Sequence, residues 1–193
     1  METSARRRKT GRPLSFDRDV ALHAAMLLFW RHGYEATSLA DLTAAMGVTP
    51  PSIYAAFGDK KGLFLAAVDR YLSGPVTSAT IIADAATARD AAQELLAAAV
   101  VGFTGADTPP GCLLASAAIS CSAAAADVAE ALAARRRAIE AQLRTRMVDE
   151  GLPDADVRAA YVMAVIQGLS TLARDGAGRE KLVRVTDVAM QGW

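Results

Sequence analysis

The apolar positions along the chain repeat with the period of an α-helix. Leu22, Ala25, Met26 and Phe29 are spaced three, four and seven residues from the first of them, which places them on one face of a helix. Similar stripes recur up to the C-terminus, and no segment shows the strict alternation that indicates a β-strand. The pattern therefore predicts an all-α protein of about nine helices.

Glycine, proline and capping residues divide this pattern into segments. Gly33, Gly47, Gly58 and Gly151 each follow an apolar stripe, as expected for residues that end helices. The predicted helices are 16–32, 39–46, 50–57, 59–73, 88–103, 112–122, 127–150, 155–174 and 179–191.

Two of the short helices have the spacing of a helix-turn-helix. Ser38 is a candidate N-cap with Asp41 three residues later, and Gly47 ends the first short helix. Thr49 is the next N-cap candidate, and Pro50 occupies the first turn, where a missing N–H costs nothing. A glycine-containing turn of about four residues joins the two helices, as in helix-turn-helix proteins.

Charge is unevenly distributed, although the 193-residue chain is neutral overall. Residues 1–13 carry five basic side chains against Glu2 alone, which leaves +4 there and therefore −4 on the rest. A basic arm on a neutral body favours contact with a polyanion. We predict a flexible arm over residues 1–15, with five DNA-binding candidates: Arg6, Arg7, Arg8, Lys9 and Arg12.

Several classes of protein are excluded by what the sequence lacks. It contains no secretory h-region and no uncharged apolar run of about 18 residues, so we expect a cytoplasmic protein with no membrane segment. It contains no P-loop, no Gly-x-Gly-x-x-Gly motif and no His-Glu-x-x-His motif, so we expect no enzyme and no cofactor. Cys112 and Cys121 lie nine residues apart, which on one straight helix directs them to opposite faces, and His23 and His32 have the same spacing. We therefore expect no metal site.

The stretch LLFWRHGYEATSLADLTAAMGVTPPSIYAAFGDKKGLFLAAVDRY resembles the DNA-binding region of TetR-type transcriptional regulators. The resemblance covers about residues 16–72 and rests on the glycine-tyrosine pair after the first helix, the helix-turn-helix, and the tyrosine and lysine that follow. It implies a three-helix DNA-binding domain over residues 16–58 and a helical effector-binding and dimerisation domain over 59–193. The family's phosphate contacts fall here on Ser38, Tyr54 and Lys60, and its base-facing positions fall on Ala40, Thr49, Pro50, Ser52 and Ala55.

The second short helix departs from the family's common pattern because its exposed side chains are so small. Alanine stands at Ala55 and Ala56, where bulky polar or aromatic groups are frequent in the family. Without long donors the helix cannot make many bidentate base contacts. We therefore expect more of the sequence readout to come from arginines of the arm, inserted into an A·T-rich minor groove.

The resemblance further implies a homodimer that binds a palindromic DNA operator and is released by a small-molecule effector, with repression as the default activity. The last two helices supply the predicted dimer interface: Tyr161, Val165, Gly168, Leu169, Leu172, Leu182, Val185 and Ala189. The predicted effector pocket is mainly apolar with a few polar groups. Its residues come from positions 103–114 and from the predicted helix over 155–174: Phe103, Cys112, Leu113, Leu114, Tyr161, Met163 and Gln167.

Two alternatives stay open at the level of sequence. Cys112 follows a Pro-Pro-Gly loop, so the protein could instead be a thiol- or metal-responsive regulator that uses this residue. An effector-independent DNA-binding protein of the nucleoid type is the other alternative. A sequence preference that is lost on adding a small molecule would separate a sensor from that second class.

Overall fold

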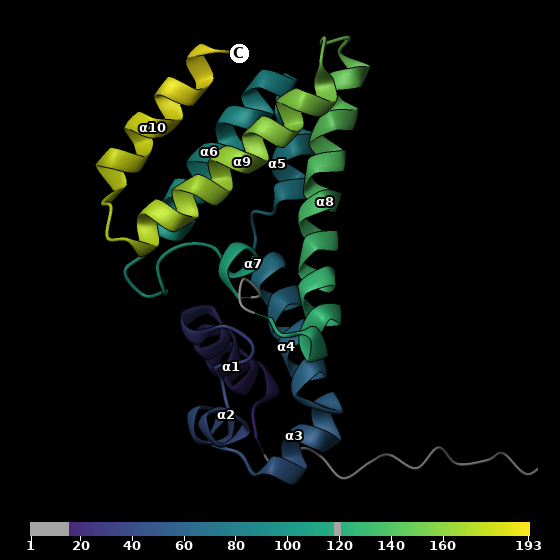
Figure 1. Ribbon diagram of the computed structural model, residues 1–193, viewed down its shortest axis with the longest axis vertical. Helices are drawn as coiled ribbons and strands as arrows, with labels where there is room; N and C mark the ends of the chain where they lie inside the picture. The colour runs from purple at the N-terminus through teal and green to yellow at the C-terminus, as the bar shows by residue number, and fades with distance from the viewer. Residues whose placement is uncertain (1–15, 118–120) are drawn as a thin grey trace, which may run out of the picture.

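The computed structural model describes residues 16–117 and 121–193, and these residues form ten α-helices and one short 3₁₀ turn without any β-strand (Figure 1). The all-α fold predicted from the apolar pattern is confirmed. None of the helices in these two ranges is both long and apolar enough to cross a lipid bilayer. The elements are α1 (Arg18–His32), α2 (Leu39–Met46), α3 (Pro50–Phe57), α4 (Lys60–Leu72), α5 (Ser78–Asp84), α6 (Ala88–Phe103), α7 (Leu113–Ser116), the 3₁₀ turn (Ala123–Ala125), α8 (Ala126–Asp149), α9 (Ala155–Arg174) and α10 (Arg179–Gln191).

The molecule is elongated, with α1, α2 and α3 at one end of its long axis (Figure 1). We call these three helices the head. The helices α5, α6, α8, α9 and α10 form the other end, which we call the body, and α4 leads from the head toward it beside the first turns of α8. The short α7 lies between head and body and contacts α1, α4, α8 and α9.

Local capping signals fix the helix ends of the head. The Asp17 carboxylate accepts hydrogen bonds from the N–H groups of Asp19 and Val20 at the start of α1. Ser38 and Asp41 form a reciprocal capping box at the start of α2, and Gly47 ends that helix with φ +65°. The caps predicted at Ser38 and Gly47 are confirmed, and they hold α2 as a short rod separate from α3.

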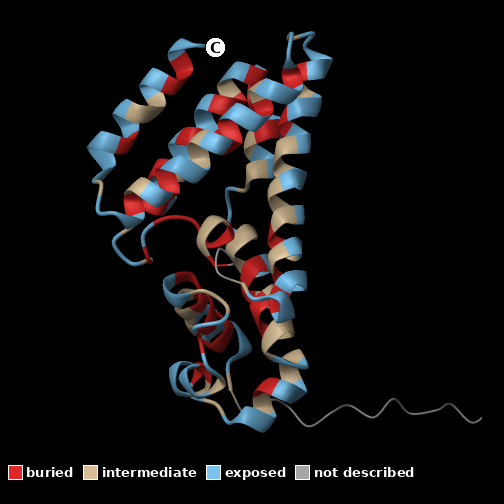
Figure 2. Ribbon diagram, viewed as in Figure 1, coloured by how far each residue is buried: buried red, intermediate tan, exposed pale blue. Residues whose placement is uncertain are grey.

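A small aromatic core holds the head to α4. The rings of Phe29 and Phe64 meet edge to face with centroids 5.0 Å apart, and both side chains are fully buried. Leu42 from α2 and Ile53 from α3 are equally buried in the same cluster. Each such side chain stabilises the fold by about 1.5–3 kcal/mol on burial, so the orientation of α3 is set by its inner face (Figure 2).

The body is built on α6, α8 and α9, which pack against one another around Leu96, Leu132, Leu143 and Leu169. The last helix, α10, covers α6 and α9 through the fully buried Leu182. Buried and exposed positions alternate along these helices, so each has an inner face in the core and an outer face in solvent (Figure 2).

Helix α5 is an element that the sequence pattern does not predict. Its N-cap is Thr77, whose hydroxyl accepts the Thr80 N–H while the Thr80 hydroxyl accepts the Thr77 N–H. Ile82 anchors it in the core, and it packs against α6 and α8. The nearby Pro75 and the shortness of the apolar pattern hide this helix, which brings the number of α-helices to ten rather than about nine.

The predicted helix over 112–122 is wrong in its length. Cys112 is the N-cap of α7, which ends at Ser116, and Cys121 lies in no helix. The Ala117 carbonyl accepts a hydrogen bond from the Tyr34 N–H at 2.9 Å, where a continuing helix would have used the N–H of Cys121. The two cysteines therefore do not share a helix, and the argument from opposite faces does not apply to them.

Candidate functional site

The start of α3 presents a row of small and polar side chains to solvent. Thr49, Pro50 and Ala55 are exposed, and Tyr54 is 51% exposed. Ile53 on the opposite side is fully buried, so the row cannot turn inward without breaking the core. Ser52 is partly exposed, so all the predicted residues of this helix reach solvent.

Two hydroxyl groups mark the N-terminal end of that face. The Thr49 hydroxyl makes no hydrogen bond to the backbone of α3 and instead lies 3.0 Å from the hydroxyl of Ser52. The proline pair at the first two helical positions removes two backbone donors there. The side chains of Thr49 and Ser52 are therefore the polar groups that this end of α3 offers to a ligand.

The predicted residues of α2 have different surroundings. Ala40 is exposed on the same end of the molecule. The Ser38 hydroxyl and the Ser38 backbone N–H both donate to the Asp41 carboxylate and lower the pKa of Asp41, while the same hydroxyl accepts the Asp41 N–H. A phosphate could take the Ser38 proton only by displacing that carboxylate.

The lysine pair that starts α4 divides between two roles. The Lys60 ammonium lies 4.6 Å from the centre of the Tyr34 ring and 3.4 Å from the Glu35 carbonyl oxygen, and partial burial lowers its pKa. Lys61 pairs with Asp127 at the start of α8. Lys61 therefore connects α4 to the body, whereas Lys60 lies beside the glycine-tyrosine turn.

The five basic candidates of the arm, Arg6, Arg7, Arg8, Lys9 and Arg12, lie outside the described residues.

The head is tied to the segment around α7 by two hydrogen bonds. The Trp30 indole N–H donates to the Gly111 carbonyl at 3.0 Å in a buried position, and the Tyr34 N–H donates to the Ala117 carbonyl. Trp30 is 4% exposed and packs edge to face on Tyr71 of α4, with ring centroids 4.9 Å apart. A movement of α7 or of Tyr71 therefore reaches α1 directly.

A cavity of about 290 Å³ lies on the other side of this junction, between α4, α5, α6, α7, α8 and α9. The structure places Phe103, Cys112, Leu114, Met163 and Gln167 of the predicted effector residues in its lining.

Two predicted effector residues lie elsewhere. Leu113 is fully buried and does not line the cavity, and Tyr161 is 48% exposed on α9, with its hydroxyl donating to the Ala189 carbonyl at 3.3 Å. Neither residue lines this cavity, because neighbouring residues of a helix point in different directions.

The cavity wall also contains residues of α4, α5 and α8 that the sequence pattern did not indicate, among them Tyr71, Ile81 and Arg136. Ile81 belongs to α5, so it could have been predicted only together with that helix. No signal in the sequence identifies Arg136, because it stands between Arg135 and Arg137.

Cys112 faces the cavity with a protonated thiol. Its sulfur accepts a hydrogen bond from the Tyr71 hydroxyl at 3.5 Å. Burial raises the pKa of the Cys112 thiol and also that of Tyr71, so both groups are neutral at pH 7. A neutral, buried thiol is a poor nucleophile. Among the described residues no group of three or more His, Cys, Asp or Glu side chains could hold a metal ion.

The predicted dimer residues fall into two sets. Leu169, Leu182 and Ala189 are buried within the subunit's own core, so they are not available to a partner, and their assignment to an interface is wrong. The others, Tyr161, Val165, Gly168, Leu172 and Val185, are exposed or partly exposed.

A continuous outer stripe runs along α9, which we call the α9 stripe and define as Val157, Ala160, Tyr161, Ala164 and Gly168. All five residues are exposed, carry no charge and recur at helical spacing on one face. Val188 of α10, 66% exposed, adds another apolar side chain to the outer surface of these two helices.

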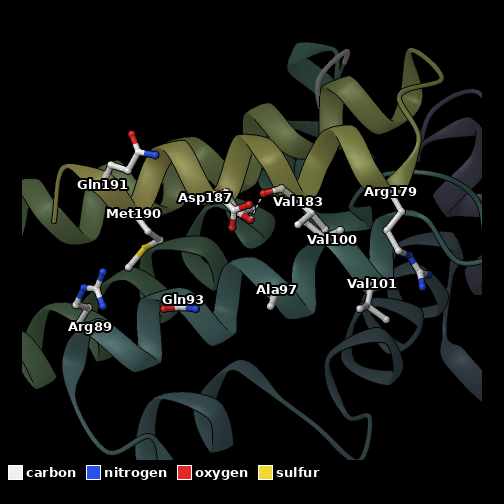
Figure 3. Close-up of a pocket in the computed structure, with 11 residues that line it drawn as sticks. Arg89, Gln93, Ala97, Val100, Val101, Arg179, Val183, Asp187, Met190 and Gln191 are labelled. Carbon is white, nitrogen blue, oxygen red and sulfur yellow. Dashed lines mark hydrogen bonds between the residues drawn. The ribbon is translucent and has the colours of Figure 1, made fainter.

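A second hollow, an open groove of about 450 Å³, separates α6 from α10 (Figure 3). Arg89 and Arg179 stand near its two ends, with Ala97 and Val183 between them (Figure 3). None of the predicted effector residues lies in this groove.

Residues 21–67 match the family model described as bacterial regulatory proteins, tetR family. The chain is similar to the HTH-type transcriptional repressor ComR of Escherichia coli K12, with 38% identity over 200 residues that cover 99% of this chain and 95% of that protein. It is also similar to the HTH-type transcriptional repressor BdcR of the same organism, with 30% identity over 98% of this chain and 95% of that protein.

Among solved structures the chain resembles the TetR family transcriptional regulator CifR, a cysteine mutant complexed with 26-bp double-strand operator DNA. The two share 39% sequence identity with a TM-score of 0.86, over 95% of this chain and 100% of that one.

Proposed function

The chain belongs to the TetR family of bacterial regulatory proteins and is a DNA-binding transcriptional regulator; from that premise we propose how it recognises and leaves its operator. Residues 16–58 bind double-stranded DNA, and residues 59–193 form a homodimer and hold a small-molecule effector. The protein represses transcription from a palindromic operator in the cytoplasm and dissociates when the effector occupies the 290 Å³ cavity. Repression is supported by the names of the two curated relatives.

The observation that carries this proposal is the exposed row on α3. In a helix-turn-helix protein the N-terminal residues of the second helix contact base edges in the major groove. Here these residues are Thr49, Pro50, Ser52 and Ala55, which are exposed or partly exposed while Ile53 of the same helix is buried. Their small size allows close approach of the helix to DNA, and Tyr54 can donate its hydroxyl to a phosphate.

Dimerisation supplies the second reading head. The α9 stripe offers small, uncharged side chains on a helix that already packs against α10, so two copies can pair these helices as a four-helix bundle. A two-fold dimer places one copy of α3 on each half of a pseudo-palindrome, with the half-sites one helical turn or a multiple of it apart.

Effector release follows from the position of the cavity. Its wall includes Tyr71 of α4 and Leu114 of α7, and both elements are packed or bonded to α1. A ligand that spreads this wall favours a different angle between head and body. Because both heads must fit one operator, that change lowers DNA affinity, which is a coupling between two distinct sites.

The DNA-binding proposal is tested with Ala55→Glu and a matched control, Ala134→Glu. Each variant adds one carboxylate at an exposed alanine within a helix, on α3 and on α8 respectively. A duplex is first selected from random sequences by the wild-type protein, and its affinity for each variant is then measured by fluorescence anisotropy. We expect Ala55→Glu to weaken binding at least about tenfold, roughly 1.4 kcal/mol, because a carboxylate repels the phosphate backbone.

The control should bind the selected duplex as the wild-type protein does. Equal affinities of the two variants would contradict the assignment of α3 as the reading helix. A selection that enriches no sequence would overturn the proposed function itself.

A further inference from the structure

Three consecutive arginines on α8 have three different environments. Arg135 pairs with Asp69 at 2.6 Å, and Arg137 pairs with Glu130. Arg136 between them lines the ligand cavity and donates to the Leu114 carbonyl of α7. Within the described ranges no carboxylate lies within 4.0 Å of Arg136, and residues 118–120 are Ala, Ile and Ser, which carry no charge.

Arg136 is the one charged side chain in a wall that is otherwise apolar or neutral, as far as the described residues define it. Leu72, Leu95, Ile139 and Ile166 are typical of the rest of the lining. No Asp or Glu side chain belongs to the described wall, so the cavity carries a single positive charge.

The Arg136 guanidinium lines the same cavity as the Cys112 thiol, whose pKa is raised by burial. A guanidinium has five N–H donors in a planar fork, of which the Leu114 carbonyl uses one, so donors remain for a ligand.

We propose that the effector held in this cavity is a molecule with one carboxylate on an apolar body, the carboxylate being bound by Arg136. This inference rests on the proposed effector role of the cavity and adds the chemical class of the ligand. A carboxylate matches the fork of a guanidinium with two parallel hydrogen bonds, and the pairing is strong where water is excluded. At about 30 Å³ for each water-sized group, the cavity holds on the order of ten non-hydrogen atoms.

The same contact gives the ligand a route to the head. A carboxylate bound to the remaining donors draws the guanidinium toward the cavity and so weakens its hydrogen bond to the Leu114 carbonyl, which is the arginine's protein partner on α7. The C-terminal end of α7 continues to Ala117, whose carbonyl accepts the Tyr34 N–H of the head. Occupation of the arginine thus loosens the connection from α8 through α7 to the head.

Octanoate and 1-octanol are the probes, because they share an apolar chain and differ in the carboxylate. Binding of each to the full-length protein is measured by isothermal titration calorimetry, and release from the selected duplex is measured by anisotropy. We expect octanoate to bind at least about tenfold more tightly than octanol and to release DNA at lower concentration. Arg136→Met, which keeps an apolar stem, should reduce this preference to less than about twofold.

Arg137→Met is the matched control, because it removes a neighbouring arginine that pairs with Glu130 instead of lining the cavity. It should keep the wild-type preference for octanoate. Arg136→Lys keeps the charge and should retain part of the preference, so a loss caused by unfolding of Arg136→Met is distinguished by this variant and by the melting temperature.

The comparison of the two probes on the wild-type protein decides the proposal without any variant. Equal binding of octanoate and octanol, or binding of neither, overturns the carboxylate assignment. An unchanged preference in a folded Arg136→Met protein overturns the role of Arg136. Failure to bind any selected duplex overturns the proposed function instead, while the calorimetric preference still tests the carboxylate.

Discussion

Replacement of Trp30 by Phe tests the connection between head and body. Trp30 lies on α1, is 4% exposed and donates its indole N–H to the Gly111 carbonyl at 3.0 Å. Phenylalanine keeps an aromatic ring that can still pack on Tyr71, but it has no donor for the buried carbonyl.

The expected loss of stability has two parts. An unsatisfied buried carbonyl costs about 1–3 kcal/mol. The smaller ring leaves a void on the order of 40 Å³, which costs about 1 kcal/mol at about 24 cal/mol per Å³. We therefore expect Trp30→Phe to lower the free energy of unfolding by about 2–4 kcal/mol, which corresponds to a fall in Tm of about 4–16 °C for a chain of this length.

Thermal and urea unfolding followed by circular dichroism measure this difference, and Trp193→Phe is the control. Trp193 is the second of the two tryptophans and is partly exposed at the C-terminus, where its ring lies 5.6 Å from the Arg158 guanidinium. Its replacement should cost no more than about 1 kcal/mol. If Trp30→Phe were no less stable than Trp193→Phe, the indole bond would not hold the two parts together, and the coupling route through Gly111 would be refuted.

Three further substitutions probe other parts of the structure. Gly111→Ala should lower stability by more than about 2 kcal/mol or abolish soluble expression, because φ is +81° there and a Cβ would lie 2.8 Å from the Ser170 carbonyl oxygen; wild-type urea unfolding would contradict it. Glu150→Gln should reduce the loss of stability in acid, because the hydrogen bond from the Ala88 N–H lowers the pKa of Glu150. The contribution of Glu150 to stability is present above pH 4.5 and is lost as the pH falls through the folded pKa. Melting temperatures measured between pH 6 and 3 test this, and the same dependence of Tm on pH in variant and wild type would contradict it. Ala164→Arg places a charge in the middle of the α9 stripe and should shift sedimentation toward a monomer and weaken operator binding at least about tenfold, whereas an intact dimer would remove this face from the interface.

The head could be predicted from sequence almost to the residue because its signals are local. Asp17, Ser38 and Gly47 each act within four residues of the helix ends that they set. Such signals are independent of the rest of the fold. The exposure of Thr49, Pro50 and Ala55 on α3 agrees with the base-facing positions that the family resemblance implies.

The segment around α7 could not be predicted because a distant contact overrides its alanine-rich composition. The Tyr34 N–H takes the Ala117 carbonyl, and the helix ends near that point although the next residues favour helix. Arg136 could not be identified for a similar reason. Nothing in the sequence distinguishes it from Arg135 and Arg137, since the partners of Arg135 and Arg136 lie on other helices and that of Arg137 lies two turns away on α8.

The dimer face illustrates a different limit of periodicity. Helix α9 has apolar residues around most of its circumference, so a stripe shows which residues share a face without showing which face meets the subunit's own core. Leu169 and Tyr161 fall on different sides of the helix in this structure, one at 1% and the other at 48% exposure.

The exposed alanines of the head, Ala40 and Ala55, can be replaced without loss of packing. Ala40 and Ala55 are exposed, and the inner face of α3 is already held by Ile53, so a longer side chain at either position removes no packing. Surface substitutions of this kind usually alter stability by no more than about 0.5 kcal/mol, whereas a new bidentate contact to a base adds about 1–3 kcal/mol of discrimination. A library restricted to these two codons should therefore yield proteins retargeted to new operators, with neither the scaffold nor the sensor disturbed.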